Sequence, residues 1–290
     1  MTEYIKSKTI LSRLSGAPDP YFGITYNMNL YRGCQHQCIY CDSRSKVYRL
    51  GDLSHIRIKQ NALFLLEKEL RSKRKKGTVG TGSMNDPYMP VEAKEQLTRR
   101  AMELLAHYHF PVHALTKSDL VLRDMDIWQE LAKVYAAVSF TITTPSDELS
   151  RKIEPGAPLS SLRFKAMESL ARDKIYCGVI LSPVLPFLTD KEESIRLMIQ
   201  KAAEAGASYI IAWMGMTQRE GQREYFYSKL DQYFPGLSKQ YANTFGSNYQ
   251  CSSPDAKALY AVFQEECDKQ NIPVRMKFYQ EDTPTQLEMF

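Results

Sequence analysis

Strand-like apolar segments alternate with amphipathic helical segments through most of this chain, and the alternation restricts the folds open to it. Alternating strands and helices are typical of βα units that form a parallel sheet. We count six such units, two fewer than the eight of a closed barrel, and therefore predict an α/β fold with an open or partial barrel. The predicted strands are residues 23–30, 78–83, 112–116, 137–143, 176–181 and 209–214. The predicted helices between them include residues 93–108, 124–135, 162–173 and 192–205.

The domain organisation follows from the same pattern, which has no break between residues 23 and 216. A chain of 290 residues can form one α/β barrel, so we expect an N-terminal extension over residues 1–22 and a barrel core over residues 23–216. Residues 217–281 are expected to form a mostly helical C-terminal extension that covers the open side of the barrel or its substrate mouth. Its predicted elements are helices at 222–233 and 254–270 and a short strand at 274–278.

The composition excludes several classes of protein. No apolar run approaches the roughly 18 residues that a membrane-spanning helix needs, and no secretory leader opens the sequence. Three of the six cysteines lie close together and the other three are scattered, unlike the disulfide framework of a secreted protein. We therefore expect a cytoplasmic protein with no membrane partner.

Cys34, Cys38 and Cys41 form a compact group with three and then two intervening residues. This spacing suits a four-iron cluster, which is usually held by four thiolates. A loop that supplies only three leaves one iron open to a small molecule. A structural zinc site is the alternative, because His36 could complete a Cys3His set. His36 lies between two of the cysteines, however, where wrapping one ion with all four residues is sterically awkward.

The cysteine loop resembles the signature of the radical S-adenosylmethionine (radical SAM) enzymes, C-x3-C-x-aromatic-C, with Tyr40 at the aromatic position. The resemblance implies a partial (βα)6 radical SAM barrel, a [4Fe-4S] cluster and SAM chelated to the free iron. It also implies reductive cleavage of SAM to a 5′-deoxyadenosyl radical that abstracts hydrogen from the substrate. A reductant such as flavodoxin or ferredoxin is then a further partner. In such enzymes the cofactor supplies the difficult chemistry, while the protein positions the substrate.

The segment after the second predicted strand is a candidate for binding the SAM amino group, because chemistry in such barrels gathers at strand ends. Gly82 lets the backbone approach a ligand closely, and Ser83 and Asp86 offer hydrogen-bond acceptors. Radical SAM proteins use a glycine-containing strand end at this place. The alternative is a simple turn before the next helix, since Asp and Pro are common turn residues.

Later strand ends supply further candidates for SAM contacts. Lys117 could pair with the SAM carboxylate, although it could equally be a surface residue. The hydroxyls of Thr141 and Thr143 could meet the ribose. Arg163 is a second candidate for the carboxylate, because a guanidinium binds carboxylates in a bidentate manner. Leu185 lies in an apolar loop, rich in proline, that could pack against adenine or be only a βα turn.

Several strings resemble one branch of the radical SAM proteins, the spore photoproduct lyase relatives often labelled DNA repair photolyases. In the namesake enzyme the adenosyl radical reverses a thymine dimer of spore DNA, and a cysteine donates the hydrogen. Cys251 is our candidate for that donor, from a predicted loop that could reach the mouth. Cys177 begins a predicted strand and should lie at the opposite end. The strings are Tyr31–Cys34, Asp86–Tyr88, Thr116–Ser118, Arg123–Asp124, Glu154–Pro158 and Pro183–Asp190.

These resemblances give one leading function and two alternatives. The leading function is a radical SAM enzyme that acts on a nucleic-acid base or DNA lesion, with Tyr26, Tyr31 and Tyr88 as candidates to stack on a base drawn out of the helix. The first alternative keeps the chemistry but acts on a peptide, a tRNA or a small metabolite. The second is a nonenzymatic, metal-stabilised module that binds nucleic acid.

Two further segments bear on partners. The net charge of +5 includes a dense basic run, residues 71–76, which is either a solvated helix end or a phosphate-binding patch. Residues 282–290 are expected to form a flexible tail. Its last five residues, Gln286 to Phe290, resemble the peptide by which bacterial polymerases and repair proteins dock on the β sliding clamp. A sliding clamp is therefore a candidate partner, and a tail that packs on its own barrel is the alternative.

Overall fold

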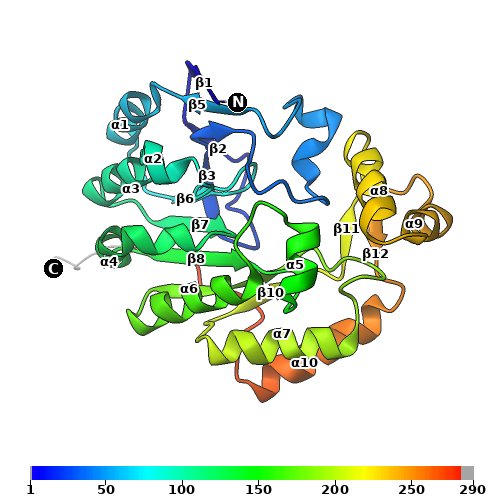
Figure 1. Ribbon diagram of the computed structural model, residues 1–290. Coiled ribbons are helices and arrows are strands. Elements are labelled where there is room, and N and C mark those ends of the chain that lie inside the picture. The colour runs from blue at the N-terminus through cyan, green and yellow to red at the C-terminus, as the bar shows by residue number, and fades with distance from the viewer. Residues whose placement is uncertain (1, 282–290) are drawn as a thin grey trace.

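The computed structural model describes residues 2–281 and contains an open, twisted sheet with helices around it (Figure 1). Six parallel strands follow one another in chain order, and β2 (Leu11–Arg13) adds an antiparallel strand beside the first of them. The strands at the two ends, β10 and β2, are not paired with each other in the described chain, so the predicted partial barrel is confirmed. The six are β3 (Ile24–Met28), β6 (Thr78–Thr81), β7 (Val112–Thr116), β8 (Ala136–Thr141), β9 (Tyr176–Leu181) and β10 (Ile210–Ala212).

Helices that connect the strands pack on the outer side of the sheet (Figure 1). All residues of β6 and β8 are buried, as expected for parallel strands that are covered on both faces. The longer connecting helices each turn an apolar stripe towards the sheet, for example Leu66 and Leu70 in the first of them. The helices are α1 (Ala62–Ser72), α2 (Glu92–Glu95), α3 (Leu97–His107), α4 (Met125–Ala132), α5 (Asp147–Ile153), α6 (Ser160–Arg172) and α7 (Glu192–Glu204).

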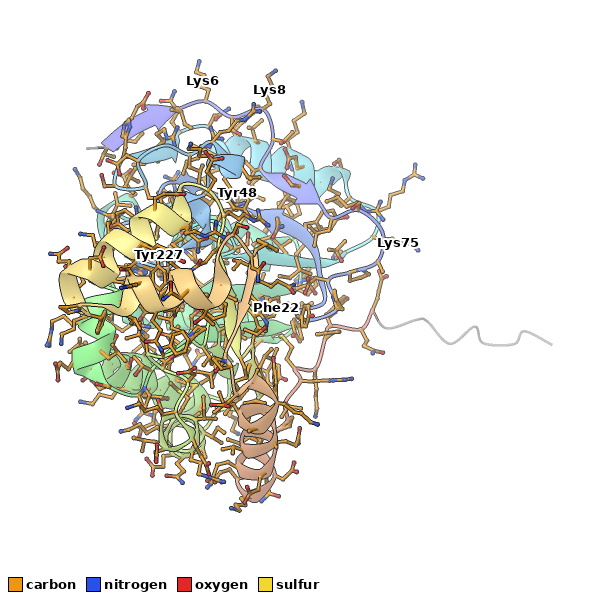
Figure 2. All side chains as sticks on the ribbon, turned by 90° about the vertical axis from the view of Figure 1, so that its right-hand side faces the viewer. Lys6, Lys8, Phe22, Tyr48, Lys75 and Tyr227 are labelled. Carbon is orange, nitrogen blue, oxygen red and sulfur yellow. The ribbon has the colours of Figure 1, made fainter. Side chains whose placement is uncertain are left out.

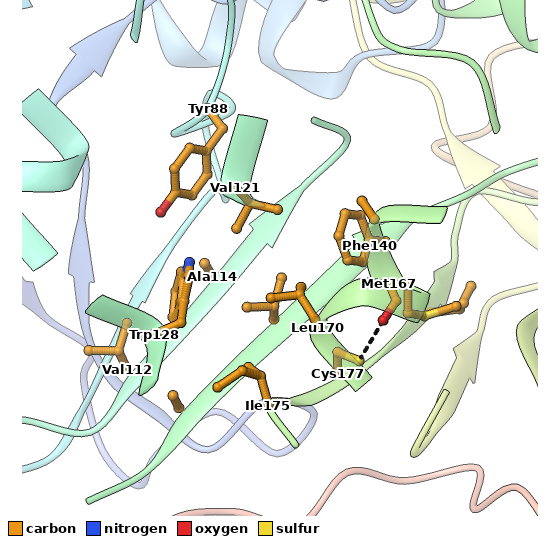
Figure 3. Packing of buried hydrophobic residues seen from close by; sticks show 14 of the residues in the cluster. Tyr88, Val112, Ala114, Val121, Trp128, Phe140, Met167, Leu170, Ile175 and Cys177 are labelled. Carbon is orange, nitrogen blue, oxygen red and sulfur yellow. Dashed lines mark hydrogen bonds between the residues drawn. The ribbon is translucent and has the colours of Figure 1, made fainter. Parts of the chain in front are cut away.

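The main core lies between the sheet and these helices (Figure 3). Trp128 of α4, Leu170 of α6 and Phe140 of β8 are all fully buried in it. The thiol of Cys177 in β9 donates to the backbone oxygen of Met167, at 3.7 Å. Cys177 therefore belongs to the core packing.

The chain after β10 forms two parts. The strand β11 (Gly215–Thr217) pairs antiparallel with β12 (Gln250–Ser252), and the helices α8 (Gln222–Tyr233) and α9 (Leu237–Phe245) come between them. These two helices lie beside the cysteine loop, and α10 (Ala256–Lys269) lies along α7 (Figure 1). The extension therefore flanks the carboxyl ends of the strands on one side and the helical layer on the other.

The predicted strand at residues 274–278 is wrong, because this segment has no regular structure. Its backbone bonds to tyrosine hydroxyls instead of to a neighbouring strand: Lys277 N donates to the Tyr176 hydroxyl at 2.8 Å, and the Tyr135 hydroxyl donates to Lys277 O at 2.7 Å. The clamp-like residues 286–290 lie outside the described residues, so that hypothesis stays a prediction. No helix within residues 2–281 is long and apolar enough to span a bilayer.

A small second sheet was not predicted from the sequence. The strand β5 (Ile56–Lys59) pairs in parallel with β1 (Thr2–Ile5) and antiparallel with β4 (Tyr31–Arg32). The strand β4 comes just before the cysteine loop in the chain, and single-turn 3-10 helices at Asp42–Arg44 and Lys46–Tyr48 follow the loop, before β5. A longer 3-10 segment, Asp119–Asp124, leads into α4.

The buried face of α6 provides a test of the fold. We expect Leu170→Ala to lower the free energy of unfolding by about 2–5 kcal/mol, because it removes a fully buried side chain and leaves a cavity. Leu162→Ala on the same helix, where the side chain is 38% exposed, should change it by less than about 0.5 kcal/mol. Chemical denaturation followed by circular dichroism measures both. Equal effects of the two substitutions would contradict this packing.

Candidate functional site

A cavity of about 330 Å³ lies at the carboxyl ends of the central strands, beneath the cysteine loop. Eight of the residues predicted from the sequence as site residues line it, together with groups from the neighbouring strand ends such as Thr116 and Ser182. The cysteine loop, the segment after β6, the end of β7 and the end of β8 therefore meet at one place, as parallel strands require. The eight are Cys34, Cys38, Cys41, Gly82, Ser83, Asp86, Lys117 and Thr141.

Backbone hydrogen bonds anchor the cysteine loop from several directions. Cys34 N donates to Leu53 O at 2.8 Å, and Ile39 N donates to Ile153 O at 2.9 Å. From the other side, the Gln222 side chain in α8 donates from Nε2 to Tyr40 O at 2.8 Å. These contacts come from the segment before β5, from α5 and from the C-terminal extension. The positions of the thiols are thus set by parts of the chain that are far apart in sequence.

Gly156, just after α5, allows a close approach to the cysteine loop. Its N–H donates to His36 O at 2.9 Å, and a Cβ atom at this position would lie only 2.1 Å from Gln35 O. Any larger residue would push the cysteine loop away from α5. The family-like string Glu154–Pro158 therefore includes a steric requirement for glycine.

The three thiols suit a cluster better than a single ion. Burial raises the pKa of Cys34 to about 12 and also raises the pKa of Cys38, so these side chains become thiolates readily only next to a bound cation. Within residues 2–281, no group of three or more His, Cys, Asp or Glu side chains is arranged to hold one metal ion. In a four-iron cluster, by contrast, each thiolate binds its own iron.

His36 does not join the cysteines as the zinc alternative would require. Its Nδ1 lies 3.3 Å from Oδ2 of Asp86, and both side chains are buried. Asp86 also accepts hydrogen bonds from Thr116 Oγ1 at 2.7 Å and from Lys117 N at 2.6 Å. Although burial alone would raise its pKa, His36 and these donors lower the pKa of Asp86 to about 2. Asp86 therefore joins the cysteine loop to the end of β7, and its carboxylate is already committed.

In the segment after β6, Gly82 and Ser83 also line the cavity, but within the described chain neither has a side chain engaged in hydrogen bonds as Asp86 is. Gly82 has a φ of +101°, and a Cβ atom there would lie 2.0 Å from Leu115 O. The backbone of β6 and β7 can come together at this point only because the residue is glycine. Ser83 is exposed at the cavity wall, where its hydroxyl can accept a hydrogen bond.

Two predicted SAM contacts, Arg163 and Thr143, are instead used inside the protein. The Arg163 guanidinium is fully buried and its Nη1 lies 2.6 Å from Oε2 of Glu154. Thr143 donates to Oε1 of the same carboxylate at 3.2 Å, and so does the Tyr40 hydroxyl. Because Glu154 already pairs with its guanidinium, Arg163 cannot bind the carboxylate of a ligand. The prediction that Arg163 binds the SAM carboxylate is therefore wrong.

Glu154 is the residue that sequence reasoning missed. Burial favours its neutral form, but Arg163 and Lys117 outweigh that effect and lower its pKa. Lys117, in turn, is subject to burial that favours its neutral form, yet Cys38 and Glu154 raise its pKa. Its ammonium lies 5.9 Å from the Tyr40 ring centroid. In the sequence, Glu154 is only an acidic residue before a Pro-Gly pair between two helices, and this pattern does not indicate that the side chain is buried.

Five other predicted side chains do not line the cavity. Leu185 is buried in the second apolar cluster, behind the cysteine loop. Cys251 is in β12 instead of a loop, is fully buried, and its thiol donates to Asn248 O at 3.6 Å. Tyr31 and Tyr88 are completely enclosed and Tyr26 is 6% exposed, so the prediction that these rings stack on a base is wrong. Strand pairing and core packing enclose all of these side chains.

Comparisons with known proteins show the family of this chain. The family described as the Radical SAM superfamily matches residues 28–199. An uncharacterized protein of Mycobacterium tuberculosis is 31% identical over 231 residues, which cover 76% of this chain and 67% of the relative. An uncharacterized protein of Methanocaldococcus jannaschii is 34% identical over 173 residues, covering 59% of this chain and 64% of the relative.

Solved structures are similar in fold over most of the chain. A spore photoproduct lyase variant superposes with a TM-score of 0.71 at 14% identity, over 92% of this chain and 79% of that chain. Spore photoproduct lyase in complex with dinucleoside spore photoproduct gives a TM-score of 0.67 at 15% identity, with the same coverage. At such identities the likeness concerns the fold alone.

The thiol group can be tested by metal content. We expect Cys38→Ala, purified and reconstituted without oxygen, to bind little iron and sulfide, because two thiolates cannot hold the cluster in place. Cys267→Ala, which removes a buried thiol of α10 far from the loop in sequence, should retain both. Iron and sulfide assays and the absorption spectrum measure the difference. Full cluster content in Cys38→Ala would exclude this set of ligands.

The buried ion pair gives a prediction for stability. Arg163→Met leaves the carboxylate of Glu154 unpaired in the interior, and we expect it to lower the free energy of unfolding by about 3–5 kcal/mol. Arg172→Met, at the exposed end of the same helix, should change it by less than about 0.5 kcal/mol. Adding Glu154→Gln to Arg163→Met should recover part of the loss, as thermal unfolding can measure. No recovery in the double variant would show that the pair is not the source of the effect.

Proposed function

Since this chain belongs to the radical SAM superfamily, whose enzymes use a [4Fe-4S] cluster and SAM, we propose that it cleaves SAM reductively and abstracts hydrogen from a nucleic-acid base, such as a DNA lesion. The observation that carries this proposal is the meeting of three thiols, the Gly82 backbone and Lys117 on the wall of one cavity. When bound, the cofactors supply the one-electron chemistry. The protein supplies binding, orientation and the exclusion of water.

The groups on the cavity wall have separate tasks in this proposal. The thiols of Cys34, Cys38 and Cys41 hold the cluster. The uncommitted hydroxyl of Ser83 and the backbone beside Gly82 accept hydrogen bonds from an ammonium group, and the ammonium of Lys117 attracts a carboxylate. Thr141 lies at the end of β8 on the same wall, within the region where a ribose would lie. These assignments leave out Asp86, because its carboxylate is already engaged by His36, Thr116 and Lys117 N. They also leave out the predicted contacts that do not line the cavity, namely Tyr40, Thr143, Arg163 and Leu185.

The size of the cavity supports a large substrate that reaches it from outside. At about 330 Å³, it is near the lower limit of the roughly 300–1,000 Å³ of ligand sites, so one molecule of the size of SAM fills most of it. A base drawn out of a strand can present a C–H group at the mouth without entering fully. The fold shared with spore photoproduct lyase, which has been solved in complex with a dinucleoside photoproduct, supports the same class of substrate.

Reductive cleavage of SAM is the direct test. We expect the reconstituted protein, under anaerobic reduction, to form 5′-deoxyadenosine, and to form it faster when oligonucleotides that contain the damaged or modified base are present. Chromatography of the products measures both rates. No 5′-deoxyadenosine from a protein with a loaded cluster would exclude the activity. Cleavage that peptides or small metabolites stimulate and oligonucleotides do not would exclude the proposed substrate class.

The donor hypothesis for Cys251 has its own test. Because the thiol is enclosed in β12 and does not line the cavity, we expect Cys251→Ala to keep its cluster and its turnover with the stimulating oligonucleotide. Product analysis in deuterated buffer reports whether hydrogen return changes. A loss of turnover at normal cluster content would restore this thiol as the donor.

A further inference from the structure

Two further cavities lie next to the cysteine-lined cavity, beside the three-stranded sheet of β1, β4 and β5. The second cavity, of about 220 Å³, shares Met84 and Asn85 with the first. The third, of about 330 Å³, shares Asn29, Arg32 and Lys59 with the second. The shared lining residues place the three cavities next to one another. We call the second and third cavities together the basic trough.

The charge of the trough is of one sign. Its lining contains four basic side chains, Lys6, Lys8, Arg32 and Lys59, and within the described chain it contains no Asp or Glu. None of the four forms an ion pair with a carboxylate within residues 2–281. The nearby carboxylate of Glu69 is engaged by the backbone N–H groups of Ile10 and Leu11. A groove with unpaired cations concentrates anions.

The fold places two of these cations together at an energetic cost. Tyr31 of β4 lies opposite Ile58 of β5, so Arg32 and Lys59 extend from the other face of this sheet. Lys59 is partly buried, and its Nζ donates to Asn29 O at 2.6 Å. Burial and the charge of Arg32 lower the pKa of Lys59. An anion bound between the two side chains would relieve this repulsion.

An aromatic ring also lines the trough. Tyr48 lines the second cavity, and its hydroxyl donates to Oδ2 of Asp42 at 2.8 Å while the Arg219 guanidinium lies 5.6 Å from the ring centroid. The ring is therefore held in place and half-exposed. In Figure 2, Lys6 and Lys8 project from the upper edge, Tyr48 lies below them, and Phe22 on the wall of the first cavity lies lower still.

We propose that the basic trough binds the sugar–phosphate backbone of the polynucleotide strand whose base is presented at the first cavity. Arg32 and Lys59 bind the phosphate nearest that base, Lys6 and Lys8 bind the next ones along the strand, and Tyr48 stacks on a neighbouring base. A row of cations with an aromatic ring is how proteins hold single strands. This inference rests on the proposed function and adds the path of the strand to it.

Charge reversal at Arg32 tests the path. Fluorescence anisotropy of a labelled single-stranded oligonucleotide, measured with the full-length holoprotein over a range of salt, should show affinity lowered roughly tenfold or more by Arg32→Glu. Lys8→Ala should lower the slope of log affinity against log salt by about 0.7, the value for one lost phosphate contact on a single strand. Iron content and thermal unfolding of each variant confirm that it is folded.

The matched control is Lys75→Glu in the basic run, which makes the same charge change at an exposed position away from the trough (Figure 2). Its affinity should fall much less than that of Arg32→Glu. Equal losses in the two variants, or an Arg32→Glu protein that binds like wild type, would overturn the inference. Polyglutamate that displaces the oligonucleotide as well as unlabelled DNA does would also overturn it, because the trough would then be a site for acidic peptides.

SAM cleavage separates this inference from the proposed function. Suppose that oligonucleotides stimulate SAM cleavage by the wild type, and that Arg32→Glu reaches half-maximal stimulation at the same oligonucleotide concentration. The trough then does not bind the strand, and the proposed substrate class stands. If oligonucleotides bind in an Arg32-dependent way but never stimulate cleavage, the trough stands as a strand-binding site and the proposed substrate class is wrong.

Discussion

The buried carboxylate of Glu154 holds the site together. It accepts from the Tyr40 hydroxyl in the cysteine loop, faces the Arg163 guanidinium of α6 and accepts from Thr143 beyond β8. Its charge also acts on Lys117. A charge in the interior is tolerated only when it is paired and hydrogen-bonded, so these elements must come together for the protein to fold. The same requirement fixes where the thiols lie relative to the strand ends.

In this arrangement, the polar groups that stabilise the site differ from those that are available to a ligand. The polar groups that are fully engaged with one another, namely Glu154, Arg163, Thr143 and the carboxylate of Asp86, form a rigid support behind the cavity. The groups that keep free hydrogen-bonding or charge capacity, Ser83 and Lys117 among them, face the cavity. The basic trough extends this logic to the surface, because its cations have no carboxylate partners in the described chain. Polar and charged groups without partners in the described chain therefore line both the first cavity and the basic trough.

The strands and most helices could be predicted because they depend on local patterns. All six parallel strands are present, and the order of pairing follows the chain, as right-handed βα units require. The elements that were missed are short or weakly patterned, and they include β2, β11, β12, α5, α9 and the three-stranded sheet. Strands of two to four residues, such as β4 and β5, carry too little periodicity to be recognised. The segment 274–278 alternates like a strand but bonds to tyrosine hydroxyls instead.

The thiol group, its spacing and the parallel sheet that brings strand ends to one edge could all be predicted, since each depends on residues that are near in sequence. Which polar side chains face the cavity could be seen only in the folded protein. Arg163 and Thr143 turn to Glu154, Asp86 turns to His36, and Cys251 is enclosed, whereas Lys6, Arg32 and Lys59 meet across a sheet that local patterns do not predict. The reason is physical: whether a polar group serves a ligand depends on whether the folded chain has already satisfied it, and its partners come from distant segments.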